Sequence, residues 1–137
     1  MNAFTLWEDE SFTVSTPRNP HFPYSEGPHI IISPKREIPN AWYDIELAAA
    51  TFRLASKICR ITENLKLASW FNIQANGNWG LLPGGTPFFH VHVYGRQKTE
   101  SWGKPIVLPE LPGTYQNDPM PESDRDKLAN ELKQQPG

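Results

Sequence analysis

One long stretch with helical periodicity constrains the fold of this chain more than any other feature. Between about residues 42 and 60, apolar side chains recur at steps of three and four residues, which places them on one face of a helix. They are Ile45, Ala48, Ala49, Phe52, Ala55 and Cys59. Asn40 is expected to cap this helix, because an Asn side chain accepts hydrogen bonds from the free amides of a first turn. A helix with one apolar face needs another apolar surface to cover it.

Short apolar-rich runs on both sides of the helix are expected to be the strands that supply this surface. The expected strands are residues 4–7 and 11–15, which form an N-terminal hairpin around an acidic turn, 29–32, 68–75 and 88–94. The run from His29 to Ile32 is rich in β-branched residues, so we expect it to be central and buried, ending at Pro34. Ser123 is expected to cap a final helix. The pattern as a whole predicts an α+β fold.

The bulk properties limit the size and the partners of the protein. A chain of 137 residues corresponds to one domain, and its 13 Lys and Arg against 15 Asp and Glu give a net charge of -2, so no overall positive field attracts nucleic acid. Cys59 is the only cysteine, which excludes an internal disulfide and a cysteine-rich zinc site. An acidic start and the lack of any membrane-length apolar stretch favour a cytoplasmic protein that does not enter membranes.

Proline clusters suggest a division of the chain. We assign residues 1–103 to one domain and residues 104–137 to a Pro-rich C-terminal extension with a terminal helix. The extension is expected either to belong to the same domain or to form a dimer contact.

The segment from His90 to Tyr94 has the residues best suited to chemistry. Side chains two apart in a strand share a face, so His90, His92 and Tyr94 point one way, while Val91 and Val93 point the other. Two adjacent imidazoles in a buried strand are costly unless they are hydrogen-bonded or bind a ligand. A simpler interpretation is that one histidine is a satisfied core residue and the other is partly solvated.

A metal site is a further alternative for these histidines. Gly84 followed by His90 and His92 matches the opening of the cupin metal motif, which continues with a carboxylate. The chain has Arg96 or Gln97 at that point, and two histidines alone make an incomplete metal site. We therefore expect no metal and no cofactor.

Three segments of the chain resemble the histidine triad nucleotide-binding family. The run His90-Val91-His92-Val93-Tyr94-Gly95-Arg96 is similar to the family signature, in which three histidines alternate with apolar residues. The upstream segment from Asn19 to Arg36, with its Gly27-Pro28-His29 and Pro34-Lys35-Arg36, resembles a second family block, and Gly84-Gly85-Thr86 resembles the family's phosphate loop. The resemblance spans residues 4 to 100. It implies an antiparallel sheet of about five strands with one long helix packed on it and a C-terminal helix.

The resemblance also implies roles for individual residues. His92, as the middle histidine of the motif, would attack the α-phosphorus of a nucleotide and form a nucleotidyl-imidazole, with His90 and His29 as hydrogen-bonded support. Tyr94 stands where most family members have the third histidine. A phenol transfers protons less readily than an imidazole at neutral pH, so the departure puts simple phosphoramidate hydrolysis in doubt.

Further residues are candidates for contacts to the nucleotide. Gly85 and Thr86 would offer backbone amides to phosphate oxygens, and Asn19 would contact the ribose. Asn76 and Arg96 are additional phosphate candidates, for which ordinary loop and strand-end hydrogen bonding are alternatives.

The expected function is that of a nucleotide-binding hydrolase or nucleotidyltransferase, acting on dinucleoside polyphosphates or nucleoside phosphoramidates. The alternative is a catalytically impaired nucleotide-binding module. Family members usually pair across a two-fold axis, so the resemblance implies a homodimer.

Overall fold

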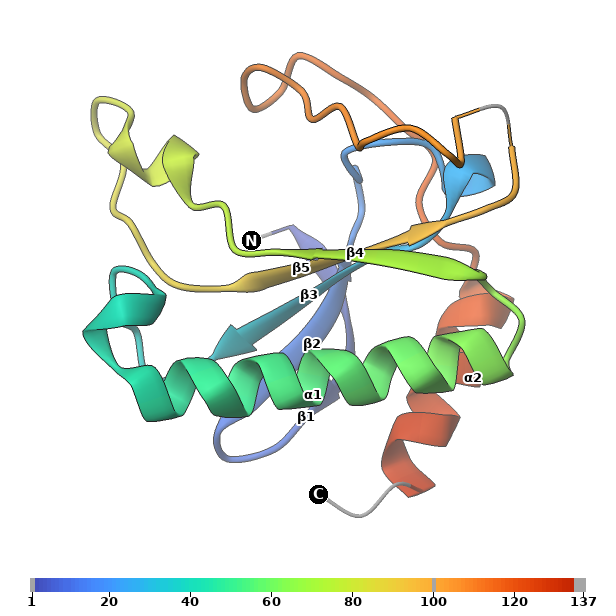
Figure 1. Ribbon diagram of the computed structural model, residues 1–137, viewed down its shortest axis with the longest axis horizontal. Helices are drawn as coiled ribbons and strands as arrows, with labels where there is room; N and C mark the ends of the chain where they lie inside the picture. Colours follow the sequence, from blue (N-terminus) through green and yellow to red (C-terminus); the bar gives the residue numbers. More distant parts are fainter. Residues whose placement is uncertain (1, 100, 135–137) are drawn as a thin grey trace.

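The computed structural model describes residues 2–99 and 101–134. Its centre is a five-stranded sheet, ordered β1-β2-β3-β5-β4, in which every neighbouring pair is antiparallel (Figure 1). The strands are β1 (Ala3–Glu8), β2 (Phe12–Pro17), β3 (His29–Pro34), β4 (Trp70–Gln74) and β5 (Val91–Arg96). The expected hairpin, the buried run at His29 and the antiparallel five-stranded sheet are confirmed.

The long helix α1 (Ile45–Asn64) lies along one face of this sheet (Figure 1). Its buried side chains, among them Ala55 and Ile58 at 0% exposure, pack in one core with the apolar side of the sheet. Its cap differs from the prediction: Asp44 accepts a hydrogen bond from the Leu47 amide at 3.0 Å. Asn40 instead caps the short 3-10 helix that precedes α1. The chain therefore needs one extra turn before α1 begins.

Strand β5 separates the apolar core from the opposite face of the sheet. Val91 and Val93 are fully buried in the core beside α1, as the alternation predicts. The strand begins three residues later than expected. The Phe89 amide donates to the Ile38 carbonyl oxygen at 2.6 Å, and the pairing of β3 with β5 starts at Ile32 and Val91. His90 therefore stands just before the strand.

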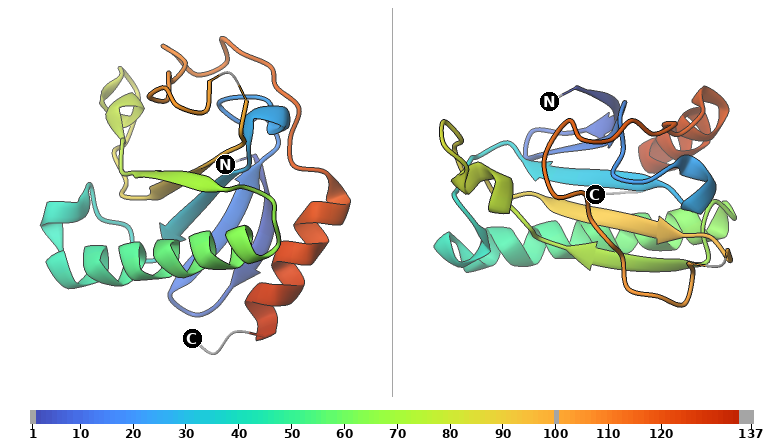
Figure 2. Two further views of the ribbon diagram at one scale, coloured as in Figure 1. Left: turned by 45° about the vertical axis from the view of Figure 1, so that its right-hand side comes forward. Right: turned by 90° about the horizontal axis from the view of Figure 1, so that it is seen from above.

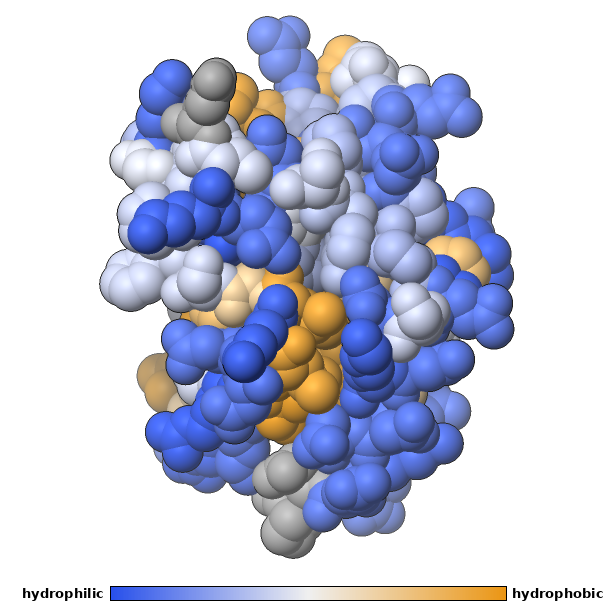
Figure 3. Space-filling model, turned by 90° about the vertical axis from the view of Figure 1, so that its right-hand side faces the viewer, coloured by the Kyte–Doolittle hydropathy of each residue, from blue (hydrophilic) through white to orange (hydrophobic). Residues whose placement is uncertain are grey.

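The C-terminal helix α2 (Glu122–Gln134) packs against β1 and α1 through the buried Leu128 and Leu132. It begins one residue before Ser123, so the expected cap at Ser123 is wrong, and the amides of Asp124 and Arg125 donate to the Pro121 carbonyl oxygen. Figure 3 shows an apolar strip between hydrophilic borders on the side of the molecule where α2 lies.

Within residues 2–99 and 101–134, the sheet face opposite α1 is covered by connecting segments with only short 3-10 turns and by no α-helix. The connection between β4 and β5 and the segment that leads to α2 rise above this face in Figure 1 and in the left view of Figure 2. In the described part of the chain, no helix is long and apolar enough to cross a membrane. A pocket can form between the sheet face opposite α1 and the segments that cover it.

Candidate active site

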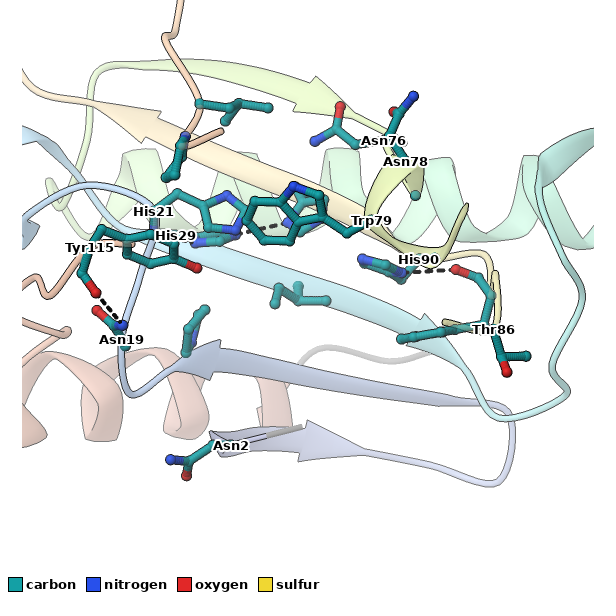
Figure 4. Close-up of a pocket in the computed structure, with 18 residues that line it drawn as sticks. Asn2, Asn19, His21, His29, Asn76, Asn78, Trp79, Thr86, His90 and Tyr115 are labelled. Carbon is teal, nitrogen blue, oxygen red and sulfur yellow. Dashed lines mark hydrogen bonds between the residues drawn. The ribbon is translucent and has the colours of Figure 1, made fainter. Parts of the chain in front are cut away.

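A pocket of about 670 Å³ lies on this loop-covered face of the sheet, and all four histidines of the chain line it. His29 comes from β3 and His92 from β5, whereas His90 immediately precedes β5 and His21 lies in the β2–β3 connection. The β4–β5 connection and the C-terminal segment supply most of the remaining wall. Figure 4 shows His21 and His29 on one side of the pocket and His90 toward the other.

The hydrogen bond of His90 determines which of its ring nitrogens has a lone pair. Its Nδ1 lies 3.0 Å from the Phe88 carbonyl oxygen (Figure 4). A carbonyl oxygen only accepts hydrogen bonds, so Nδ1 of His90 holds the proton and donates it. In the neutral ring, Nε2 of His90 is then unprotonated and has its lone pair free.

His29 and His92 form a buried pair whose protons can be placed in the same way. His29 Nε2 lies 2.8 Å from His92 Nδ1, and the His21 backbone N–H donates to His29 Nδ1 at 3.4 Å. Because His29 Nδ1 accepts, the neutral His29 ring holds its proton on Nε2 and donates it to His92 Nδ1. The neutral His92 ring therefore has its own proton on Nε2, so it is a hydrogen-bond donor and not a nucleophile in this arrangement.

The four imidazoles are held in the neutral state by their surroundings. Burial lowers the pKa of His29 and of His92 well below the usual 6.5, and the neighbouring histidines lower it further. Burial also lowers the pKa of His90, against the opposing effect of its bond to a backbone carbonyl. His21 has a pKa of about 4, through burial first and the nearby His90 second.

Tyr94 lies beneath the pocket and orients His21. Its ring is fully buried and parallel to that of His92, with 5.4 Å between the centroids. The Tyr94 hydroxyl lies 2.9 Å from His21 Nδ1, and Asn76 Nδ2 donates to the same hydroxyl at 3.4 Å. Burial raises the pKa of Tyr94, so the phenol stays protonated at neutral pH.

His21 is the pocket histidine that sequence reasoning missed. It lies in a Pro-rich loop without periodicity, and nothing in its neighbours along the chain suggests a role. The one available signal is its rarity: the chain has only four histidines, and the sequence motifs include the other three. In the folded protein the centroid of the His21 ring lies 4.5 Å from the ring centroid of His29 and 5.3 Å from that of His92.

The predicted phosphate and ribose contacts are only partly in position. Thr86 and Asn76 line the pocket. The Gly85 amide donates to the Leu82 carbonyl oxygen at 2.8 Å, so it is already engaged. Asn19 also lines the pocket, but its side chain donates to one backbone carbonyl and accepts from one backbone amide of the C-terminal segment. In this structure the Asn19 side chain holds that segment over the sheet through these two hydrogen bonds.

Arg96 is placed away from the candidate site. It is only 5% exposed and is absent from the pocket lining. Its guanidinium donates to the Asn72 side chain and to the carbonyl oxygens of Ser101 and Lys104. Its position at the C-terminal end of β5 explains this result, since the histidines occupy the other end and the middle of the same segment.

Two aromatic rings from different segments cover part of the pocket. Trp79, from the β4–β5 connection, and Tyr115, from the C-terminal segment, have nearly parallel rings with centroids 6.5 Å apart. The Trp79 indole N–H donates to the Glu110 carbonyl oxygen, which ties the two segments together. Figure 4 shows both rings beside His21. They offer flat apolar surface for a planar ligand group.

A metal ion is the other ligand that these residues could hold. One ring nitrogen each from His21, His29 and His92 lies within 4.8 Å of the others. Two ligands of a tetrahedral zinc ion stand roughly 3.4 Å apart, so the His29–His92 pair, at 2.8 Å, would have to give up its hydrogen bond and open. The donors fit zinc in number and type, but the observed geometry is that of a hydrogen-bonded pair.

The fold also excludes the cupin interpretation of the two motif histidines. A cupin is a jelly roll of two packed sheets, whereas this chain has one open sheet covered by a helix.

Comparisons with known proteins give structural relatives only. No protein-family model matches the chain, and no curated protein sequence does. Among solved structures, a zinc-bound histidine triad family protein from Mycobacterium smegmatis is 23% identical, with a TM-score of 0.68 over 98% of this chain and 86% of that one. A histidine triad protein from Sinorhizobium meliloti is 18% identical, with a TM-score of 0.68 over 97% and 89% of the two chains. An HIT family hydrolase from Clostridium thermocellum is 24% identical, with a TM-score of 0.53 over 79% and 88%. The fold expected from the sequence motifs is confirmed, and this chain has the fold of the histidine triad proteins.

Proposed function

We propose that this protein is a nucleotide hydrolase or nucleotidyltransferase that acts at an α-phosphate through a nucleotidyl-histidine intermediate. The observation that supports this most directly is the hydrogen bond between His90 Nδ1 and a backbone carbonyl, which leaves Nε2 with a free lone pair in a pocket. An imidazole so oriented can attack phosphorus. The likeness in fold to histidine triad proteins agrees with this reaction class.

The hydrogen bonds favour His90 as the nucleophile, whereas the sequence motif favoured His92. His90 Nε2 has its lone pair free, and His92 Nε2 holds a proton because His29 donates to its Nδ1. In the proposed first step a bond forms between His90 Nε2 and the α-phosphorus, and the bond from phosphorus to the leaving group breaks. His92 donates its Nε2–H to a phosphoryl oxygen, with His29 as its support. Water or another acceptor then takes the nucleotidyl group, and His90 is regenerated.

The pocket suits a nucleotide in size and in composition. Its volume of about 670 Å³ lies within the usual range for small-molecule sites. Its lining includes no Lys, Arg, Asp or Glu among the described residues, so the phosphate would be bound by neutral donors. Trp79 and Tyr115 provide flat surface for a base. We propose dinucleoside polyphosphates and nucleoside phosphoramidates as the substrate classes.

Trapping the intermediate tests this function and separates the two candidate nucleophiles. The protein is incubated with a dinucleoside polyphosphate, acid-quenched, and examined by intact-mass spectrometry and peptide mapping. We expect a mass increase of one nucleotidyl group on the peptide that contains both histidines. His90→Asn should abolish the adduct, while His92→Asn should slow its formation and still allow it. An adduct that survives in His90→Asn and disappears in His92→Asn would restore the sequence-based assignment.

The second candidate function is nucleotide binding without turnover, and it is favoured by Tyr94, which stands where the motif resemblance places a third histidine. This candidate predicts that nucleotides raise the melting temperature of the protein while no adduct and no product form under any condition.

We also retain a homodimer and a cytoplasmic location as proposals. Light scattering and cell fractionation test them.

A further inference from the structure

His21 stands in the pocket although no motif placed it there. The three imidazoles that can face a phosphate follow one another in space: His90 lies 4.7 Å from His92, and His92 lies 5.3 Å from His21, measured between ring centroids. Figure 4 shows His90 and His21 at opposite sides of the pocket. The pocket therefore contains a row of three imidazoles, and the third comes from the β2–β3 loop instead of β5.

The hydrogen bonds of His21 direct one of its N–H groups toward the pocket. Asn76 Nδ2 can only donate, so the Tyr94 oxygen accepts from it. Within the described part of the chain, His21 Nδ1 is the other hydrogen-bond partner of the Tyr94 hydroxyl, so the hydroxyl donates its proton to His21 Nδ1. In the neutral ring, the His21 proton is then on Nε2, and this N–H has no protein partner among the described residues. Tyr94 on β5 thus holds an imidazole that comes from the β2–β3 loop.

We propose that His21 is the proton donor to the leaving group in this reaction, and that Tyr94 and Asn76 position it. The inference rests on the proposed function and adds a role to it. In a displacement at phosphorus, the attacking and leaving atoms lie roughly in line on opposite sides. If His90 attacks from one end of the row and His92 donates to the phosphoryl oxygens in the middle, the leaving atom points toward His21.

The proton balance of the step is simple. A bound phosphate brings negative charge to a site where burial and His90 otherwise disfavour protonation of His21, so phosphate binding raises the His21 pKa from its value of about 4. Protonated His21 donates Nδ1–H to the Tyr94 oxygen and transfers its Nε2 proton to the leaving atom as the phosphorus bond breaks. Neutral His21 remains. The titratable groups that act on it are His29 on β3, His92 and Tyr94 on β5, Tyr115 of the C-terminal segment and His90 just before β5.

The test uses leaving groups that differ in their need for a proton. Wild type and His21→Gln are compared on two nucleoside monophosphate derivatives: a 4-nitrophenyl ester, whose leaving group departs as a stable anion, and an alkyl phosphoramidate, whose amine must be protonated. We expect His21→Gln to lower kcat/KM by about 100-fold or more on the phosphoramidate and by less than about 5-fold on the ester. The ester rate serves as the control for folding and binding in each variant.

Tyr94→Phe gives a second, independent measurement. It retains the ring and removes the hydroxyl that holds His21 Nδ1, so the loss should again be larger on the phosphoramidate, though smaller than for His21→Gln. An equal loss on both substrates in His21→Gln would reduce His21 to a structural residue and overturn the inference while leaving the proposed function intact. If wild type turns over neither substrate and forms no adduct, the proposed function itself fails, and this inference fails with it.

Discussion

Lowering the pH from 7.5 to 5.5 should destabilise the folded protein, because the buried pair His29 and His92 stays neutral only in the folded state. Their pKa values are depressed by burial and by neighbouring histidines, whereas the same residues in the unfolded chain titrate near 6.5. Below 6.5 the unfolded state binds more protons than the folded state. Stability therefore falls as the pH falls.

The magnitude follows from proton linkage alone. Each histidine that is neutral when folded and titrates at 6.5 when unfolded contributes about 1.4 kcal/mol between pH 7.5 and 5.5, so the pair contributes about 2.7 kcal/mol. His21 and His90 act in the same direction, since their pKa values are also lowered. The carboxyl groups with lowered pKa values, Glu26 and Asp44, titrate below this window.

Urea unfolding at the two pH values, followed by tryptophan fluorescence, measures this effect. His29→Leu should reduce the pH-dependent loss by about 1.4 kcal/mol whatever it does to absolute stability. The matched control is Phe89→Leu, a buried apolar position that should lower stability equally at both pH values. A wild-type loss below about 1 kcal/mol, or an unchanged loss in His29→Leu, would refute the proposed neutral pair.

Three further predictions address packing, the remote arginine and metal binding. Gly27→Ala should lower the free energy of unfolding by more than about 3 kcal/mol, because a Cβ at a φ of 141° would overlap the backbone of β5, whereas Gly113→Ala, with open space around it, should lower it by about 1 kcal/mol. Comparable melting temperatures for the two variants would contradict this. Arg96→Met should lower stability by about 3 kcal/mol because the buried hydrogen bonds of the guanidinium are lost, while kcat on the 4-nitrophenyl ester stays unchanged. A loss of activity without a loss of stability would instead place Arg96 at the phosphate. Zinc should inhibit turnover competitively with the nucleotide substrate, because zinc binding separates His29 from His92, and a chelator should restore the activity. Stimulation of turnover by zinc would indicate a metal-dependent enzyme.

The architecture was largely predictable because it depends on local patterns. The three- and four-residue apolar steps from Ile45 to Cys59 require a helix with one buried side, and the run at His29 requires a buried strand. Element ends were less predictable. Asn40 and Asp44 are equally good caps by chemistry, and only the intervening 3-10 turn selects Asp44 for α1.

For the site, the sequence alone determined that His90, His92 and Tyr94 face away from the core, since the two-residue period of a strand is a local property. Tertiary structure decided the rest. Loop closure brought His21 beside Tyr94, the C-terminal segment engaged Asn19, and strand pairing set His29 against His92. A proton's place on an imidazole depends on the atom opposite each nitrogen, and that atom usually comes from a distant part of the chain. This is why the sequence could place His29, His90 and His92 together but could not tell which of their ring nitrogens has a free lone pair.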